Sequence, residues 1–135
     1  MKKKALLIED DLLVCKVLEK ILHQRGMETV LAMDSQQAQA KCKESAADLA
    51  VISVDLLIPG GLSGWDMIEW LKARNDAAHI PIIVLTGSMI SVDEEQRLGC
   101  QVHAVIRKQE FSVKSFGQLL DKLLTPDAKT LIESA

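Results

Sequence analysis

Short apolar runs alternate five times with longer segments of helical character, and this alternation limits the fold more than any other feature of the chain. Several runs are apolar at consecutive positions, which is typical of strands that are covered on both faces. The runs occupy residues 5–8, 29–32, 49–54, 81–85 and 102–106. Five strands, each followed by a helix, predict a doubly wound α/β sandwich in which one parallel sheet carries helices on both faces.

Five segments have the apolar spacing or the capping residues of helices. They span residues 12–24, 35–44, 63–73, 91–98 and 112–124. Asp11 precedes the first segment as an N-cap, and Gly26 and Pro126 are suited to end the first and the last segment. One stripe of the first segment is expected to face the core, and it contains Leu13, Val14, Val17, Leu18, Ile21 and Leu22.

The length and composition indicate an ordinary globular domain. A chain of 135 residues is long enough for one hydrophobic core, and we expect residues 1–126 to form the domain and residues 127–135 a short tail with no output domain. A formal net charge of −3 argues against a nucleic-acid binder. No run has membrane-spanning length or the pattern of a signal peptide, so no membrane insertion is expected. The three cysteines form no CxxC motif, and a cytoplasmic location follows as the expectation.

Charged and hydroxyl side chains follow four of the apolar runs, close to where each run ends. Glu9 and Asp10 follow the first run, Asp55 the third, Thr86 the fourth and Lys108 the fifth. In open parallel sheets, ligands bind at the carboxyl ends of the strands, near the point where the strand order reverses. Carboxylates that converge repel one another unless a cation binds between them. The sequence therefore predicts a cation site at this edge of the sheet.

The residue types at this edge point to phosphate chemistry. Oxygen ligands and an open site favour Mg²⁺, with Mn²⁺ as the other suitable ion. Mg²⁺ keeps several waters and is often shared with phosphate oxygens, so acids beside a hydroxyl and an ammonium indicate a site that handles phosphate charge. The chain has no Walker-type GxxxxGKS or GxxxxGKT loop, no GxGxxG after the first strand and no GxSxG or GxCxG motif. These absences argue against nucleotide binding and against hydrolysis by serine or cysteine.

In combination, these motifs resemble the receiver domain of response regulators, and the likeness covers about residues 3–124. The intervals agree with that family as well, with 45 positions from Asp10 to Asp55, 31 from Asp55 to Thr86 and 22 from Thr86 to Lys108. The resemblance implies a flavodoxin-like (βα)5 fold with strand order 2-1-3-4-5. It is carried by LLIEDD at 6–11, DLLIPG at 55–60, Gly64, IPIIVLTG at 80–87 and Lys108.

The resemblance also implies a set of metal ligands. Asp10 would bind Mg²⁺ directly and Glu9 largely through water. Asp55 and the backbone carbonyl of Leu57 would complete the protein ligands.

For the phosphoryl group, the resemblance implies that Asp55 is the phosphoacceptor, a carboxylate nucleophile supplied by the phosphohistidine of a histidine kinase or phosphotransfer protein. Lys108 would neutralise the phosphoryl oxygens. Thr86 would hydrogen-bond to the phosphoryl group and draw its own loop inward, which switches protein–protein contacts. The chain would then be a signalling domain and not an enzyme beyond its own phosphorylation and dephosphorylation. A homodimer through a face around the fourth helix is a further implied partnership.

The register around the nucleophile leaves one alternative. Asp48 lies seven residues before Asp55, whereas about five is usual in the family, and the usual spacing would place Ser53 at the nucleophile position. We favour Asp55, because Pro59 follows it at the family's interval of four and serine has no base beside it.

Two further departures concern the switch. Val105 stands where the family generally has Tyr or Phe, and Gln109 replaces the proline that usually follows the lysine. A cis bond to a residue other than proline costs about 3 kcal/mol, so we expect a trans Lys108–Gln109 bond and a shifted Lys108. Val105 and Gln109 leave open a receiver-like interaction module with phosphorylation-independent or atypical switching. An aspartyl-phosphate hydrolase is disfavoured, because Leu57 stands where such enzymes carry a second acid.

Overall fold

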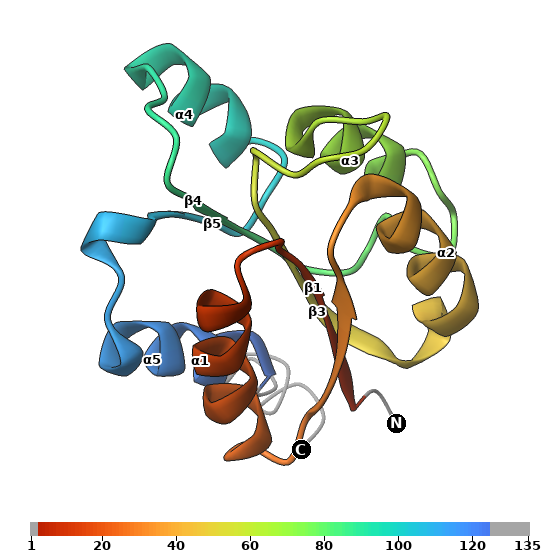
Figure 1. Cartoon of the computed structure of the whole chain (residues 1–135), viewed down its shortest axis with the longest axis vertical. Coiled ribbons are helices and arrows are strands. Elements are labelled where there is room, and N and C mark those ends of the chain that lie inside the picture. Colours follow the sequence, from red (N-terminus) through yellow and green to blue (C-terminus); the bar gives the residue numbers. More distant parts are fainter. Residues whose placement is uncertain (1–2, 125–135) are drawn as a thin grey trace, which may run out of the picture.

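The computed structural model describes residues 3–124, which form a single parallel sheet between two layers of helices (Figure 1). The strand order is β2-β1-β3-β4-β5, and every neighbouring pair is parallel, so the predicted doubly wound fold is confirmed. The predicted domain boundary at residue 126 and the predicted tail lie outside the described residues. The strands are β1 (Lys4–Ile8), β2 (Glu28–Ala32), β3 (Leu49–Val54), β4 (Ile82–Thr86) and β5 (Ala104–Arg107).

The helices divide between the two faces because successive strand residues point to opposite sides of the sheet. One core cluster joins the sheet to α1 and α5, and the other joins it to α2, α3 and α4. The helices are α1 (Leu12–His23), α2 (Ser35–Ser45), α3 (Gly64–Lys72), α4 (Val92–Gly99) and α5 (Val113–Leu124), with single 3-10 turns η1 (Ala46–Asp48) and η2 (Lys108–Glu110).

The start of the last strand differs from the prediction. We expected strand residues from position 102, whereas β5 begins at Ala104. The amide of Val102 donates to the carbonyl of Leu98 at 2.9 Å, so this residue still belongs to the turn that ends α4. The amide of His103 then makes the first bond to β4, at 2.8 Å from the carbonyl of Ile82.

The predicted buried stripe of α1 is only partly buried. Leu18, Ile21 and Leu22 are in the core, but Leu13 is 75% exposed and Val17 is 40% exposed. The first turns of α1 face Leu85, Lys108 and Phe111 across a gap. Leu13 and Val17 line an apolar pocket of about 180 Å³ in this gap.

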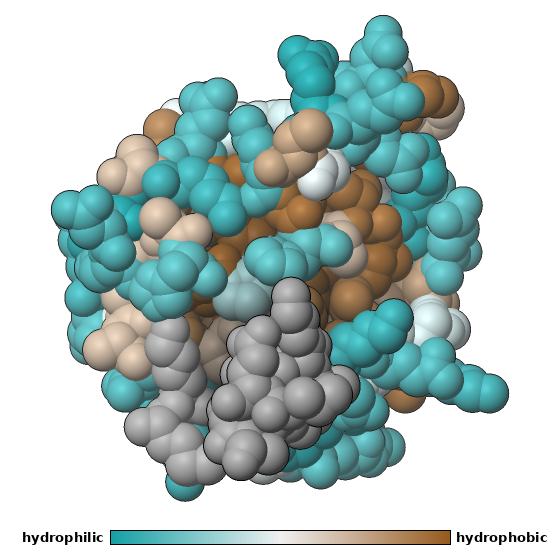
Figure 2. Space-filling model, turned by 180° about the vertical axis from the view of Figure 1, so that it is seen from behind, coloured by the Kyte–Doolittle hydropathy of each residue, from teal (hydrophilic) through white to brown (hydrophobic). Residues whose placement is uncertain are grey.

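The edge strand β5 carries residues that are only partly buried. Val105 and Ile106 line a hollow of about 300 Å³ together with Phe116 and Leu119 of α5. Figure 2, which shows the molecule from behind, shows apolar side chains gathered in the middle of that face and polar side chains around them. Among residues 3–124, no helix is both long and apolar enough to cross a bilayer.

Gly64 allows the first residue of α3 to approach the end of β3. A Cβ at this position would lie 2.4 Å from the Cα of Leu56 and 2.5 Å from the carbonyl oxygen of Asp55. The amide of Gly64 also donates to the carbonyl of Leu56 at 3.0 Å. The glycine therefore fixes the backbone that carries Asp55.

We expect Gly64→Ala to lower the free energy of unfolding by about 1–3 kcal/mol, because a backbone must move to admit the new methyl group. Gly99→Ala is the matched control, since Gly99 also lies in a helix but a Cβ there would meet nothing within 4 Å. Urea unfolding of both variants provides the test. An equal effect of the two substitutions would contradict the assignment of Gly64 as a close-approach position.

Candidate functional site

Glu9 and Asp55 lie at adjacent strand ends because the hydrogen-bond ladder of the sheet continues one residue past β1 and β3. The amide of Glu9 donates to the carbonyl of Ala32 at 3.0 Å, and the amide of Asp55 donates to the carbonyl of Ile8 at 3.0 Å. Both side chains are nearly inaccessible, with 2% and 5% of the residue surface exposed. Two acids are thus held together in a position that water barely reaches.

Asp10 joins these two acids from the exposed side of the site. One carboxylate oxygen each of Glu9, Asp10 and Asp55 lies within 4.8 Å of the others. Opposite oxygens around an octahedral Mg²⁺ are about 4.2 Å apart, given metal–oxygen bonds of about 2.1 Å. The three donors are all carboxylate oxygens, so both their spacing and their chemistry fit a hard divalent cation.

Lys108 supplies the positive charge that faces the buried acids. Its Nζ lies 2.9 Å from Oε1 of Glu9 and 3.0 Å from Oδ2 of Asp55. No peptide bond in the described part of the chain is cis, so the Lys108–Gln109 bond is trans, as expected. The ammonium nevertheless reaches both acids: Lys108 opens the turn η2, whose closing bond runs from the amide of Phe111 to the carbonyl of Lys108 at 3.2 Å.

The second oxygen of Asp55 has its own partner. The amide of Leu57 donates to Oδ1 at 3.0 Å, and Nζ of Lys108 donates to Oδ2 at 3.0 Å. The carboxylate is therefore held in one orientation by a backbone group and an ammonium. The side chain of Leu57 itself projects into solvent and is largely exposed.

Burial and charge shift the protonation of this cluster. Burial raises the pKa of Glu9 to about 7; the hydrogen bond from Lys108 lowers it by less, and the charge of Asp55 raises it further. For Lys108, burial lowers the pKa of the ammonium, but the bonds to Glu9 and Asp55 raise it by more, so the net shift is upward. Lys108 is thus firmly charged, whereas Glu9 changes its charge near neutral pH.

Thr86 ends β4 at the same edge and is fully buried. Its Oγ1 lies 2.8 Å from Oγ of Ser88 and accepts the amide of Ser88 at 3.2 Å. Ser53, the alternative nucleophile, lies inside β3, one residue before its end, and pairs with Leu7 of β1. Of the two candidate nucleophiles, Asp55 is the one that contacts Lys108.

Two features of this site were not found from the sequence. The thiol of Cys15 donates to the backbone carbonyl of Glu9 at 3.6 Å, and burial together with the charge of Glu9 raises the thiol pKa to about 11, so the group is a neutral donor. The hydroxyl pair of Thr86 and Ser88 is the other. Neither contact has a motif, because each depends on how a loop or helix turns relative to a strand end.

Comparisons with known proteins agree with this geometry. The family model described as the response regulator receiver domain matches residues 5–121. The polar-differentiation response regulator DivK of Brucella anthropi is 30% identical over 105 residues, which cover 76% of this chain and 83% of that protein.

Solved structures show the same fold. One is the receiver domain of the sensor histidine kinase PA1611 of Pseudomonas aeruginosa, with a magnesium ion in its active-site cleft; it has a TM-score of 0.76 at 24% identity and covers 91% of this chain and 98% of its own. The Mn²⁺-bound response regulator Rcp1 has a TM-score of 0.71 at 22% identity and covers 90% of this chain and 91% of its own.

The raised pKa of Glu9 predicts a pH-dependent stability of the metal-free protein. Between the unperturbed pKa of 4.5 and about 7, the folded state binds this proton more tightly than the unfolded state does. The contribution of Glu9 to stability is therefore greatest below pH 4.5 and is lost as the pH rises through 7. Relative to Glu9→Gln, the wild type should lose about 2–3 kcal/mol of unfolding free energy between pH 5 and pH 8.

Urea unfolding in the presence of a chelator measures this difference. Glu94→Gln is the matched control. The hydrogen bond from the backbone amide of Ser91 lowers the pKa of this exposed acid, so its contribution to stability changes only below pH 5. The raised pKa of Glu9 would be contradicted if the difference in unfolding free energy between the wild type and Glu9→Gln stayed constant from pH 5 to pH 8.

Proposed function

The chain belongs to the response regulator receiver domain family of two-component signalling, and on that premise we propose that Asp55 accepts a phosphoryl group from the phosphohistidine of a histidine kinase or phosphotransfer protein. The transfer is Mg²⁺-dependent and switches protein–protein contacts. The observation that carries the proposal is the environment of Asp55. This buried carboxylate lies at a strand end, contacts the ammonium of Lys108 and shares a possible cation site with Glu9 and Asp10.

The chemistry is a phosphoryl transfer between two protein side chains. A carboxylate oxygen of Asp55 attacks phosphorus, the P–N bond of the phosphohistidine breaks, and its electron pair returns to the imidazole of the donor. The product is an acyl phosphate, which later loses its phosphoryl group to water. Outside this self-phosphorylation and dephosphorylation, the domain acts as a signalling module.

The neighbouring residues have distinct tasks in this reaction. Glu9, Asp10, Asp55 and the carbonyl of Leu57 would hold Mg²⁺, or Mn²⁺ in its place, and a bound ion would supply positive charge to offset that of the acids and the phosphoryl group. Lys108 already lies 3.0 Å from Asp55 and remains beside the new phosphoryl group. Its raised pKa keeps it protonated throughout.

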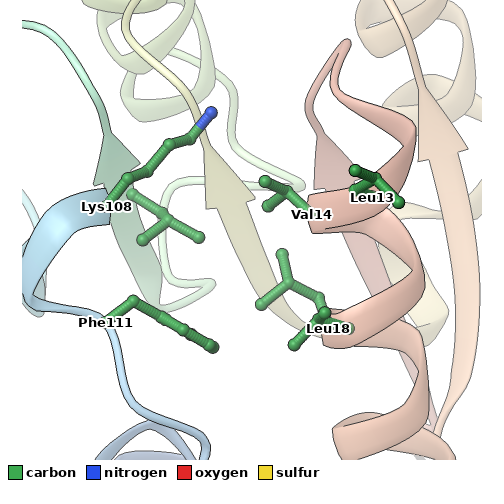
Figure 3. A pocket seen from close by; sticks show the side chains of 7 residues that line it. Leu13, Val14, Leu18, Lys108 and Phe111 are labelled. Atoms are coloured by element: carbon green, nitrogen blue, oxygen red, sulfur yellow. The ribbon is translucent and has the colours of Figure 1, made fainter.

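An apolar surface beside Asp55 supports a protein donor. The side chains of Val14 and Leu18 on α1 face Phe111 across a pocket, and the side chain of Lys108 forms part of its wall (Figure 3). Leu13 is exposed at the rim. Because Lys108 also contacts Asp55, a donor that covers this pocket brings its phosphohistidine to the acid cluster. We propose that the phosphohistidine-bearing surface of the donor packs here.

The apolar hollow around β5 supports pairing of two copies as a second part of the proposal. Val105 and Ile106 line that hollow on the edge strand together with Phe116 of α5, and Phe111 lines both the hollow and the pocket beside α1. This face is formed by β5 and α5, whereas the resemblance implies a dimer face around α4. The proposed location of the protein is the cytoplasm.

The alternative function is a receiver-like interaction module that switches without phosphate. Val105 favours it, because the valine packs into the core on the side of α2, α3 and α4 and offers no ring to follow a movement of Thr86. The acid cluster favours the phosphorylated receiver, because buried acids at this spacing are costly unless a cation compensates them.

Intact-mass spectrometry after incubation with acetyl phosphate and Mg²⁺ tests the proposal. We expect one phosphoryl group on the wild type and on Ser53→Ala, and none on Asp55→Asn or after chelation of Mg²⁺. A phosphoryl group that persists in Asp55→Asn would move the acceptor to another residue. No adduct on the wild type, either from acetyl phosphate or from a phosphorylated histidine kinase, would favour the interaction module.

A further inference from the structure

The resting partner of the Thr86 hydroxyl is Ser88. A hydroxyl group has one hydrogen to donate and two lone pairs to accept with. The amide of Ser88 occupies one of these positions at 3.2 Å, and the hydroxyl of Ser88 occupies another at 2.8 Å. In the described part of the chain, the hydrogen bonds of Thr86 through its hydroxyl go to Ser88 and not to Asp55 or Lys108. The hydroxyl is therefore directed into its own loop.

Ser88 lies where this hydrogen bond can be linked to a larger movement. Residues 87–91 connect β4 to α4, and a Cβ at Gly87 would lie 3.6 Å from Cδ of Lys108. The loop therefore passes beside the lysine that contacts Asp55. At its far end, Ser91 caps α4 through reciprocal bonds with Glu94. Between these two ends, Met89 is 95% exposed. Its neighbour Ile90 is half-buried against the core, so Met89 is the exposed side chain between the two fixed ends of the loop.

The aromatic ring that the resemblance leads us to expect at position 105 is absent. Val105 pairs with Val84 on the neighbouring strand, and the chain contains no tyrosine. Its two phenylalanines, Phe111 and Phe116, contact each other with ring centroids 5.5 Å apart and belong to the core on the side of α1 and α5. The two tryptophans, Trp65 and Trp70, lie on α3, so β5 itself carries no aromatic side chain. Ser88 is the residue that the Thr86 hydroxyl contacts.

We propose that the Ser88 hydroxyl holds Thr86 at rest, and that phosphorylation of Asp55 exchanges this contact for one between Thr86 and a phosphoryl oxygen. The inference rests on the proposed function, because it requires a phosphoryl group on Asp55. Ser88 is a positioning residue that acts through Thr86. When Thr86 leaves Ser88, residues 87–90 are released and the loop that leads into α4 changes its conformation. The signal then passes through this loop instead of through residue 105.

Binding of beryllium fluoride with Mg²⁺, a mimic of a phosphorylated carboxylate, tests the exchange in the full chain. Ser88→Ala removes a competing hydrogen bond of ordinary strength, so we expect half-saturation at a threefold to tenfold lower concentration of the mimic. Ser88→Thr keeps the hydroxyl and should bind within twofold of the wild type. In a Thr86→Val background, Ser88→Ala should have no effect, because the hydroxyl that Ser88 holds is gone.

Amide NMR spectra give an independent readout in the same titration. Without the mimic, the amide resonances of residues 87–92 in Ser88→Ala should move along the line that joins the free and the bound wild-type positions. Unchanged or weaker binding of the mimic by Ser88→Ala would overturn the inference. A gain in affinity from Ser88→Ala that persists in the Thr86→Val background would also overturn it.

The failure of the proposed function has a different signature. If the wild type does not bind the mimic, or if Asp55→Asn binds it equally well, Asp55 is not the phosphoryl site. If the wild type binds in an Asp55-dependent manner and Ser88→Ala binds no more tightly, only the role of Ser88 is wrong.

Discussion

The ion pairs from Lys108 to Glu9 and Asp55 are the interaction on which the rest of this site depends. Two acids are buried at the ends of β1 and β3, which are neighbours in the sheet. Each charge removed from water is costly unless an opposite charge compensates it. The compensating ammonium belongs to the first residue after β5, the strand at the far edge of the sheet, and its stem passes the end of β4 beside Gly87. The strand order, the turn η2 and the loop after β4 all serve this one contact.

The same contact explains why the site is suited to a change of charge. At rest, one ammonium faces two acids, and one of these acids has a pKa of about 7. The cluster can therefore adjust to a cation or a phosphoryl group by losing or gaining a proton at Glu9. The carboxylate of Asp55 is oriented by the amide of Leu57 and by Lys108, so its position is set before a donor arrives.

Much of this arrangement could be predicted from the sequence, because strand-end positions follow directly from apolar runs. Glu9, Asp55 and Thr86 were located in that way. The exposed Leu13 and the start of β5 at Ala104 were not, because Leu13 lies at an open pocket and the turn that ends α4 continues to Val102. The bond from Cys15 to the carbonyl of Glu9 and the hydroxyl pair of Thr86 and Ser88 also required coordinates. Neither contact repeats along the chain, so neither leaves a periodic pattern in the sequence.

The central claim is that Lys108 compensates the buried acids at rest and that a divalent cation shares this task. The most direct test is the free energy of unfolding at pH 8 of the wild type and of Lys108→Gln, each with a chelator and with saturating Mg²⁺. The account predicts that Lys108→Gln is less stable without metal and gains more from Mg²⁺ than the wild type does, because the ion no longer meets a competing ammonium. An equal gain in the two proteins would contradict it.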